Sequence, residues 1–145
     1  MDMDISVNIK RLSPDVPVPE YKTMGAIAFD IAVSEEKTVQ PGETAFLSTG
    51  LVVCTPPGYG LILAGRSSNA KKQITLANGV AVIDQDYCGP NDQLLLSVRN
   101  EGPTPYTIER GERIAQGLFV PIVRAAFLDV ETLSAPDRGG YGTTG

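Results

Sequence analysis

The sequence predicts an all-β domain with the architecture of a distorted jelly roll, a β-sandwich-like barrel with at most one short helix. Short apolar or alternating segments recur about every eight to twelve residues, which is the spacing typical of sandwiches and barrels. The 145 residues include 15 glycines and 11 prolines. This share exceeds the usual ~12% and favours many turns over long helices.

The first two strands are joined by an extended connector. Residues 7–9 alternate in polarity, as a half-buried strand does. Pro14, Pro17 and Pro19 then favour an extended backbone. The apolar residues 26–33 predict the second strand.

The next strands are bounded by clusters of glycine, proline and acidic residues, which favour turns. The turns cover residues 34–37, 40–43 and 55–60, and they delimit strands over residues 44–48, 51–54 and 61–64.

Two serines, Ser67 and Ser68, follow the last of these strands and can cap a helix of one or two turns. An apolar strand over residues 80–83 then runs into the acidic turn 84–86, which predicts a hairpin. Further strands are expected over residues 74–77, 93–98, 106–108, 113–123 and 125–130, with 106–108 and 113–123 forming a second hairpin.

The chain is expected to form one domain, a core of residues 1–130 followed by an arm of residues 131–145. The end of the arm is rich in glycine and cannot build a core. One interpretation is a disordered tail. The other is a flexible flap over phosphates, because its glycines, hydroxyls and arginine supply N–H donors, O–H donors and a cation.

Composition excludes several classes of function. The formal net charge of −5 argues against a general binder of nucleic acid or anionic membranes. The chain has no histidine, which excludes Ser-His-Asp and Cys-His catalysis and argues against structural zinc. No apolar stretch has membrane-spanning length, and the first residues do not resemble a signal peptide.

The two cysteines, Cys54 and Cys88, show no paired spacing. Cys54 lies in an apolar segment and is expected to be a buried thiol. Two unpaired thiols fit a reducing compartment, so we expect a cytoplasmic protein.

Asp84 is the first candidate for chemistry, because a carboxylate fixed at a strand end can act as a base or a metal ligand. The alternative is a turn that is acidic only for solubility. Asp30, Arg66 and Gln116 are further candidates. Each alone is a weak signal, since a loop arginine is usually solvated, Gln116 can simply bond to a neighbouring strand, and Tyr87 can belong to the core.

Five segments of the chain, in this order and at these spacings, resemble the five motifs of the trimeric dUTPases (deoxyuridine triphosphate nucleotidohydrolases). The segments are residues 26–31, 65–68, 78–89, 111–116 and 138–145. The resemblance implies a jelly-roll fold and hydrolysis of dUTP to dUMP and pyrophosphate, by attack of water on the α-phosphorus.

The resemblance also assigns roles to residues. Asp84 matches the general base, and Asp30 matches the acid that holds Mg²⁺ through a water molecule. Tyr87 matches the residue under the sugar, where it blocks a 2′-hydroxyl. The remaining substrate-binding positions are expected to contact the uracil or the phosphates. They are Arg66, Ser67, Ser68, Asn78, Val82, Ile83, Gln116, Arg138, Tyr141, Gly142, Thr143 and Thr144.

The family pattern implies a homotrimer with exchanged C-terminal arms and sites shared between subunits. The sequence departs from the pattern at four places. Ala28 and Ala81 replace glycines, residues 90–92 lengthen the return of the expected hairpin, and Arg138 lies closer than usual to Tyr141.

Two other functions are considered. A dCTP deaminase resembles a dUTPase and shares the Gly-Arg-Ser-Ser stretch, but it needs a glutamate where Ser97 stands. A non-catalytic dUTP sensor or a structural jelly roll is the alternative from another class, and the irregular last motif is the feature that favours it.

Overall fold

The computed structural model describes residues 4–142 of the chain, and it confirms an all-β fold with one very short helix. Helix α1 covers Asn69–Lys72. The strands are β1 Asn8–Arg11, β2 Phe29–Ala32, β3 Lys37–Val39, β4 Thr44–Ser48, β5 Leu51–Cys54, β6 Tyr59–Gly65, β7 Ile74–Leu76, β8 Val80–Ile83, β9 Leu95–Asn100, β10 Tyr106–Ile108 and β11 Arg113–Pro121.

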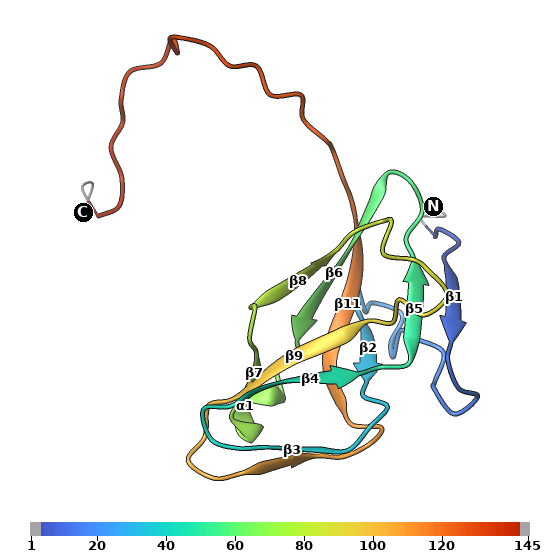
Figure 1. Cartoon of the computed structure of the whole chain (residues 1–145). Helices are drawn as coiled ribbons and strands as arrows, with labels where there is room; N and C mark the ends of the chain where they lie inside the picture. The colour runs from blue at the N-terminus through green and yellow to red at the C-terminus, as the bar shows by residue number, and fades with distance from the viewer. Residues whose placement is uncertain (1–3, 143–145) are drawn as a thin grey trace.

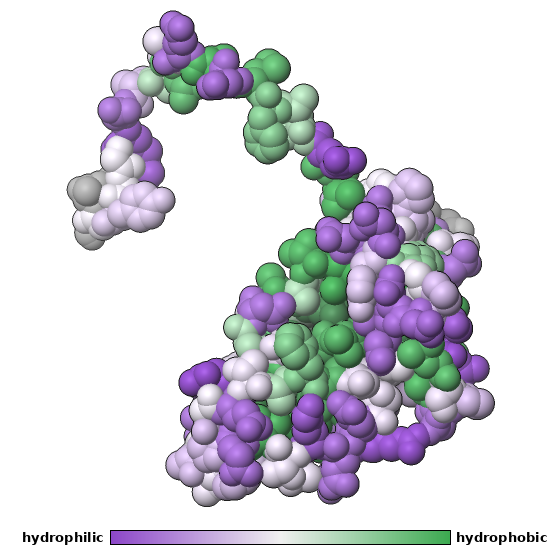
Figure 2. Space-filling view, in the orientation of Figure 1, coloured by the Kyte–Doolittle hydropathy of each residue, from purple (hydrophilic) through white to green (hydrophobic). Residues whose placement is uncertain are grey.

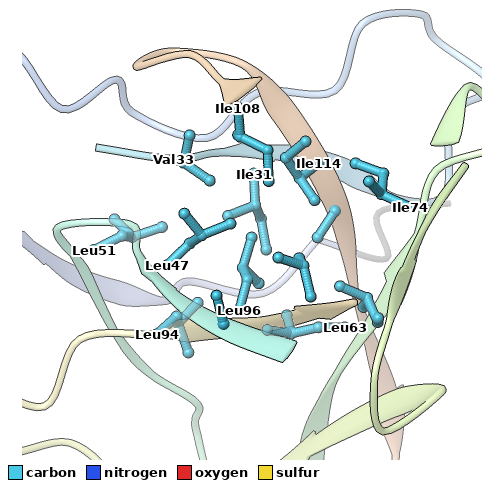
Figure 3. Close-up of a cluster of buried hydrophobic side chains, with 14 of the residues drawn as sticks. Ile31, Val33, Leu47, Leu51, Leu63, Ile74, Leu94, Leu96, Ile108 and Ile114 are labelled. Carbon is cyan, nitrogen blue, oxygen red and sulfur yellow. The ribbon is translucent and has the colours of Figure 1, made fainter. Parts of the chain in front are cut away.

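The strands form antiparallel sheets that enclose one core (Figure 1). One sheet has the order β2-β11-β6-β8 and another the order β4-β9-β7, while β1 pairs with β5 and β3 pairs with β10. In Figure 3, Ile31 and Ile114 of the first sheet point toward Leu47 and Leu96 of the second. All four side chains are buried, as expected where two sheets pack face to face.

The alternation of polarity along the strands explains this packing. In β4, Ala45 and Leu47 are buried while Thr44 and Phe46 are exposed. Because successive side chains of a strand point to opposite faces, one face of β4 covers the core and the other faces solvent in the single chain.

The two hairpins predicted from the sequence are wrong. Strand β8 pairs with β6, whereas β9 pairs with β4 and β7 in the other sheet. Strand β10 pairs with β3, and β11 pairs with β2 and β6. The segments after β8 and β10 therefore carry the chain between sheets, which is how a jelly roll differs from a row of hairpins.

Three local predictions also differ from the structure. The short strand β3 was not predicted, because Lys37 and Thr38 are exposed and only Val39 is buried. Ser68 precedes α1 but makes no side-chain cap. No strand covers residues 125–130, where the chain after Pro121 extends away from the sheets with exposed side chains (Figure 1).

The two cysteines are also paired, contrary to the expectation of unpaired thiols. Cys54 at the end of β5 forms a disulfide with Cys88, with their Cα atoms 5.2 Å apart. The bond closes a sequence separation of 34 residues, so spacing along the chain does not reveal it. Cysteine usage therefore does not indicate a reducing compartment.

Within residues 4–142, no helix has both the length and the apolar character that crossing a bilayer requires.

Candidate active site

Asp30 lies at the centre of a charged cluster on the sheet that contains β2. Its Oδ1 atom is 3.0 Å from Nε of Arg66, and its Oδ2 atom is 3.9 Å from Nη1 of Arg113. The Asp30 side chain is only 17% exposed and that of Arg66 is 30% exposed. A carboxylate so largely withdrawn from water needs these cations to balance its charge.

Hydrogen bonds connect strand β11 to the end of β6 and to the turn that follows it. Gln116 donates from Nε2 to the Gly65 carbonyl at 3.0 Å, and Arg66 donates from Nη1 to the Arg113 carbonyl at 3.2 Å. The bond that the sequence allowed between Gln116 and a neighbouring strand is therefore present. These two contacts fix the guanidinium of Arg66 beside Asp30 and Gln116, since Gln116 pairs with Asp30 across β11 and β2.

The two serines of this turn differ in their surroundings. Ser67 is exposed. The Oγ atom of Ser68 is buried and has no hydrogen-bond partner among the described residues. A buried hydroxyl without a partner carries a free-energy cost, which a bound ligand or water can remove.

Asn69 was not predicted as a site residue, although it fixes the same turn. It is buried, and its Nδ2 atom donates to the Ile114 carbonyl at 2.8 Å. Its Oδ1 atom is buried without a partner in the part of the chain that the structure describes. The contact spans 45 residues, and no local pattern in the sequence indicates it.

A second cluster, also missed, braces helix α1 against the turn before β11. Glu112 Oε2 accepts hydrogen bonds from Lys72 Nζ and the Tyr106 hydroxyl, each at 2.9 Å. Burial alone raises the pKa of Glu112, but the bonds from Lys72, the Glu109 amide and Tyr106 outweigh it and lower that pKa below its ordinary value. Burial, followed by the neighbouring Glu112, raises the pKa of Tyr106 to about 12.

Five further predicted residues lie on and around β8, the edge strand of its sheet. Asn78, Val82 and Asp84 are exposed, Tyr87 is 37% exposed, and Ile83 is half-buried against the core. The outer edge of β8 has no partner strand among the described residues. Its backbone N–H and C=O groups therefore face outward, as a template for a hydrogen-bonding ligand.

Asp84 and Arg66 do not meet in the single chain. Ile83 pairs with Leu61 near the start of β6, whereas Arg66 directly follows the end of β6 at Gly65. At ~3.4 Å per residue, roughly 20 Å of strand separates the two ends. The structure thus places the candidate base and the candidate phosphate-binding residues in two separate groups.

Of two pockets on the described part of the chain, one borders Asp30 and the other lies apart from both groups. A pocket of about 60 Å³ is lined by Asp30, Arg113, Glu20 and Lys22, among others. A pocket of about 320 Å³ lies between the segment before β2 and the turn at Gly111, and it contains none of the predicted nucleotide-binding residues. Residues 4–142 contain no cluster of three or more acidic or thiol side chains that could ligate a metal directly.

The arm residues of the predicted site extend away from the core of their own chain. Arg138, Tyr141 and Gly142 are exposed. Figure 1 shows the arm extending away from the sheets, and Figure 2 shows apolar side chains along it. Thr143 and Thr144 lie outside the described residues.

A family model described as dUTPase matches residues 15–145 of this chain. The deoxyuridine 5′-triphosphate nucleotidohydrolase of Histophilus somni strain 2336 is 40% identical over 149 aligned positions, which cover 99% of this chain and 97% of that protein. The protein of the same name from Alcanivorax borkumensis is 40% identical over 141 positions, covering 93% of this chain and 92% of that protein.

Solved structures agree with this match. The dUTPase from Streptococcus mutans has a TM-score of 0.75 and 31% identity, covering 82% of this chain and 98% of that chain. The dUTPase of Staphylococcus bacteriophage 80alpha with dUPNHPP has a TM-score of 0.85 and 25% identity, covering 97% of this chain and 98% of that chain.

Proposed function

The chain belongs to the dUTPase family, and we propose that it is a dUTP diphosphatase, a hydrolase of nucleotide metabolism that converts dUTP to dUMP and pyrophosphate. The observation that carries this conclusion is the family match over residues 15–145, together with 40% identity to a named nucleotidohydrolase over nearly the full length of both chains.

Asp84 is proposed as the general base that activates the attacking water. Its exposure at the end of β8 supports this role, because the carboxylate can reach a water and is anchored by a paired strand. A positioned base of this kind typically contributes 10²–10⁴-fold to a rate. The alternative of a turn that is acidic only for solubility predicts no such effect.

The triphosphate is proposed to bind at the turn after β6. Arg66 uses Nε and Nη1 within the chain, which leaves its Nη2 group to donate to a phosphate oxygen. The unpartnered Ser68 hydroxyl and the exposed Ser67 hydroxyl supply two further donors. Phosphoryl displacement requires mainly positioning and neutralisation of charge, which this set provides together with Gln116.

Mg²⁺ is the proposed metal, carried on the substrate phosphates and held by Asp30 through water. A single carboxylate fits this mode, because Mg²⁺ retains several waters and takes few protein ligands when phosphates are present. The pocket of about 60 Å³ beside Asp30 has space for ordered water between the carboxylate and a hydrated ion. When bound, the ion neutralises charge on the phosphates.

Uracil is proposed to bind along the open edge of β8. The backbone around Val82 and Ile83 presents N–H and C=O groups on that edge, and Asn78 lies just before the strand. A site that hydrogen-bonds one base edge rejects a base with the opposite donors and acceptors, since buried groups are then left unpaired. Tyr87 would contact the sugar.

A homotrimer is proposed, because the two halves of the site lie at opposite ends of β6. A second copy that brings its Arg66 group to the Asp84 of the first would complete the site. The arm supports exchange between copies, since Phe127 is 94% exposed and Leu133 is 82% exposed on their own chain. We propose that the arm residues Arg138, Tyr141, Gly142, Thr143 and Thr144 cover the site of a neighbouring copy. The division into a core and an arm stays a prediction, and so does the cytoplasmic location.

Chromatography of products from all common nucleoside triphosphates, with Mg²⁺ present, tests the function. We expect dUMP and pyrophosphate from dUTP, with little turnover of other triphosphates. Binding of dUTP without product would instead indicate a sensor, and release of ammonia from dCTP would indicate a deaminase.

A further inference from the structure

The ring of Tyr87 is held by the far end of its own loop. Its hydroxyl donates to the Gln93 carbonyl at 2.7 Å, across the segment that joins β8 to β9. A tyrosine bonded at its hydroxyl loses freedom to swing about its side-chain torsions. The orientation of the ring therefore depends on where the Gln93 carbonyl lies.

A tight turn places that carbonyl. The Gly89 amide donates to Asp92 Oδ2 at 2.8 Å, and the Asp92 amide donates to the Gly89 carbonyl at 3.0 Å. A Cβ atom on Gly89 would lie only 2.8 Å from Asp92 Oδ2, so this approach favours glycine. The side chain of Gln93 is fixed as well, since its Oε1 accepts the Gly50 amide at 2.9 Å.

The turn is anchored to the body of the protein on its other side. Cys88 is bonded to Cys54 of β5, and Lys10 of β1 donates from Nζ to the Pro90 carbonyl at 2.8 Å. The turn is thus a braced element, and the hydrogen bond from Gly89 to the Asp92 side chain closes it together with the backbone bond from Asp92 to Gly89.

We infer that Asp92 is a positioning residue that sets the discrimination between deoxyribonucleotides and ribonucleotides. By closing the turn, it places the carbonyl that holds Tyr87 in position against the sugar. The inference rests on the proposed function. An apolar surface alone rejects an added hydroxyl by only about a hundredfold. A ring that can move aside rejects a ribonucleotide less well than a fixed one.

The test compares kcat/KM for dUTP with kcat/KM for UTP. In Asp92→Ala the ratio falls about five- to tenfold, mainly through faster use of UTP, because a typical hydrogen bond is lost. Asp92→Asn keeps the wild-type ratio, since its amide oxygen can accept the same Gly89 N–H. Tyr87→Phe, which keeps the ring and removes the bond to Gln93, gives a loss similar to that of Asp92→Ala.

Asn91→Ala is the matched control. Asn91 lies in the same turn, and its exposed side chain makes no hydrogen bond with the described residues, so the ratio stays at the wild-type value. The inference is overturned if folded Asp92→Ala keeps the wild-type ratio, or if Asn91→Ala loses as much. If Asp92→Ala does not fold, an unchanged ratio in Tyr87→Phe overturns it. Failure of the wild-type protein to hydrolyse dUTP would instead refute the proposed function.

Discussion

Arg66 and Asp30 form an ion pair of 3.0 Å between the turn after β6 and strand β2, two segments that are both bonded to β11. The pair fixes the direction of the guanidinium and leaves one of its nitrogens for a ligand. It also keeps the carboxylate beside the place where we propose that the triphosphate and its metal bind.

Asp30→Asn is expected to raise the Mg²⁺ concentration needed for half-maximal dUTP hydrolysis by about tenfold, since partners of metal-bound groups typically contribute this much. The neutral amide attracts a hydrated cation less strongly. Titrating Mg²⁺ at saturating dUTP measures the shift. Glu20→Gln, at an exposed acid lining the same pocket, serves as control and keeps the wild-type Mg²⁺ dependence. An unchanged titration in Asp30→Asn would remove Asp30 from the metal site.

Asp84→Asn is expected to bind dUTP normally and to lose 10²–10⁴-fold in kcat, because it keeps the shape of the side chain and removes the base. Calorimetric binding of a non-hydrolysable analogue and pyrophosphate release provide the two measurements. Asp86→Asn is the matched control, an exposed carboxylate two residues further along the same turn. Equal losses in the two variants would show that the charge of the turn, rather than one base, is what matters.

Mixing two inactive variants tests whether sites are shared between copies. Asp84→Asn and Arg66→Ala are each expected to be inactive alone. After co-refolding, about a quarter of the sites in randomly mixed closed oligomers would combine an intact Asp84 with an intact Arg66 from different copies. Recovery of a comparable fraction of wild-type activity supports a shared site. No recovery, with mixed oligomers demonstrated by mass, would place both residues of each site on one chain.

Local sequence patterns predict the strands better than their partners. Strands β4 and β5 have the predicted bounds, because alternation of polarity and the turn at Gly50, with φ of 67°, are local properties. The pairing of β8 with β6 instead of β9 is not local. It depends on which apolar faces meet across the core, and periodicity along one segment cannot decide that.

The candidate site likewise contains residues that local patterns predict and residues that they do not. Asp30, Arg66 and Gln116 are predictable as residue types in recognisable segments, and the structure brings them together. The contacts of Glu112 with Lys72 and of Asn69 with Ile114 were missed because they join residues 40 and 45 positions apart in the sequence. The residues that support a site are thus harder to predict than those that are proposed to contact the ligand.

The disulfide between Cys54 and Cys88 is expected to stabilise the oxidised protein by about 2–4 kcal/mol, since it closes a loop with a sequence separation of 34 residues in the unfolded chain. Urea unfolding of glutathione-oxidised protein with and without reductant measures the difference. The double variant Cys54→Ser, Cys88→Ser should not respond to reductant. Two titratable thiols in the oxidised native protein would contradict the pairing.

Tyr106 is expected to make stability depend on pH in the alkaline range. Its pKa is about 12 in the folded protein, against an ordinary value of 10.0, because burial and the neighbouring Glu112 favour the protonated form. The folded state therefore holds this proton more tightly than the unfolded chain. The resulting stabilisation is full below pH 10 and is lost as the pH rises toward 12.

Tyr106→Phe removes this dependence together with the hydrogen bond to Glu112. The free energy of unfolding of the wild-type protein, measured with urea at several values between pH 8 and about 11.5, should therefore fall more steeply than that of the variant above pH 10. Because every other tyrosine and lysine is common to the two proteins, the difference between their slopes isolates Tyr106. Parallel curves over this range would show that Tyr106 titrates alike in the folded and unfolded states, and that its bond to Glu112 does not hold the proton.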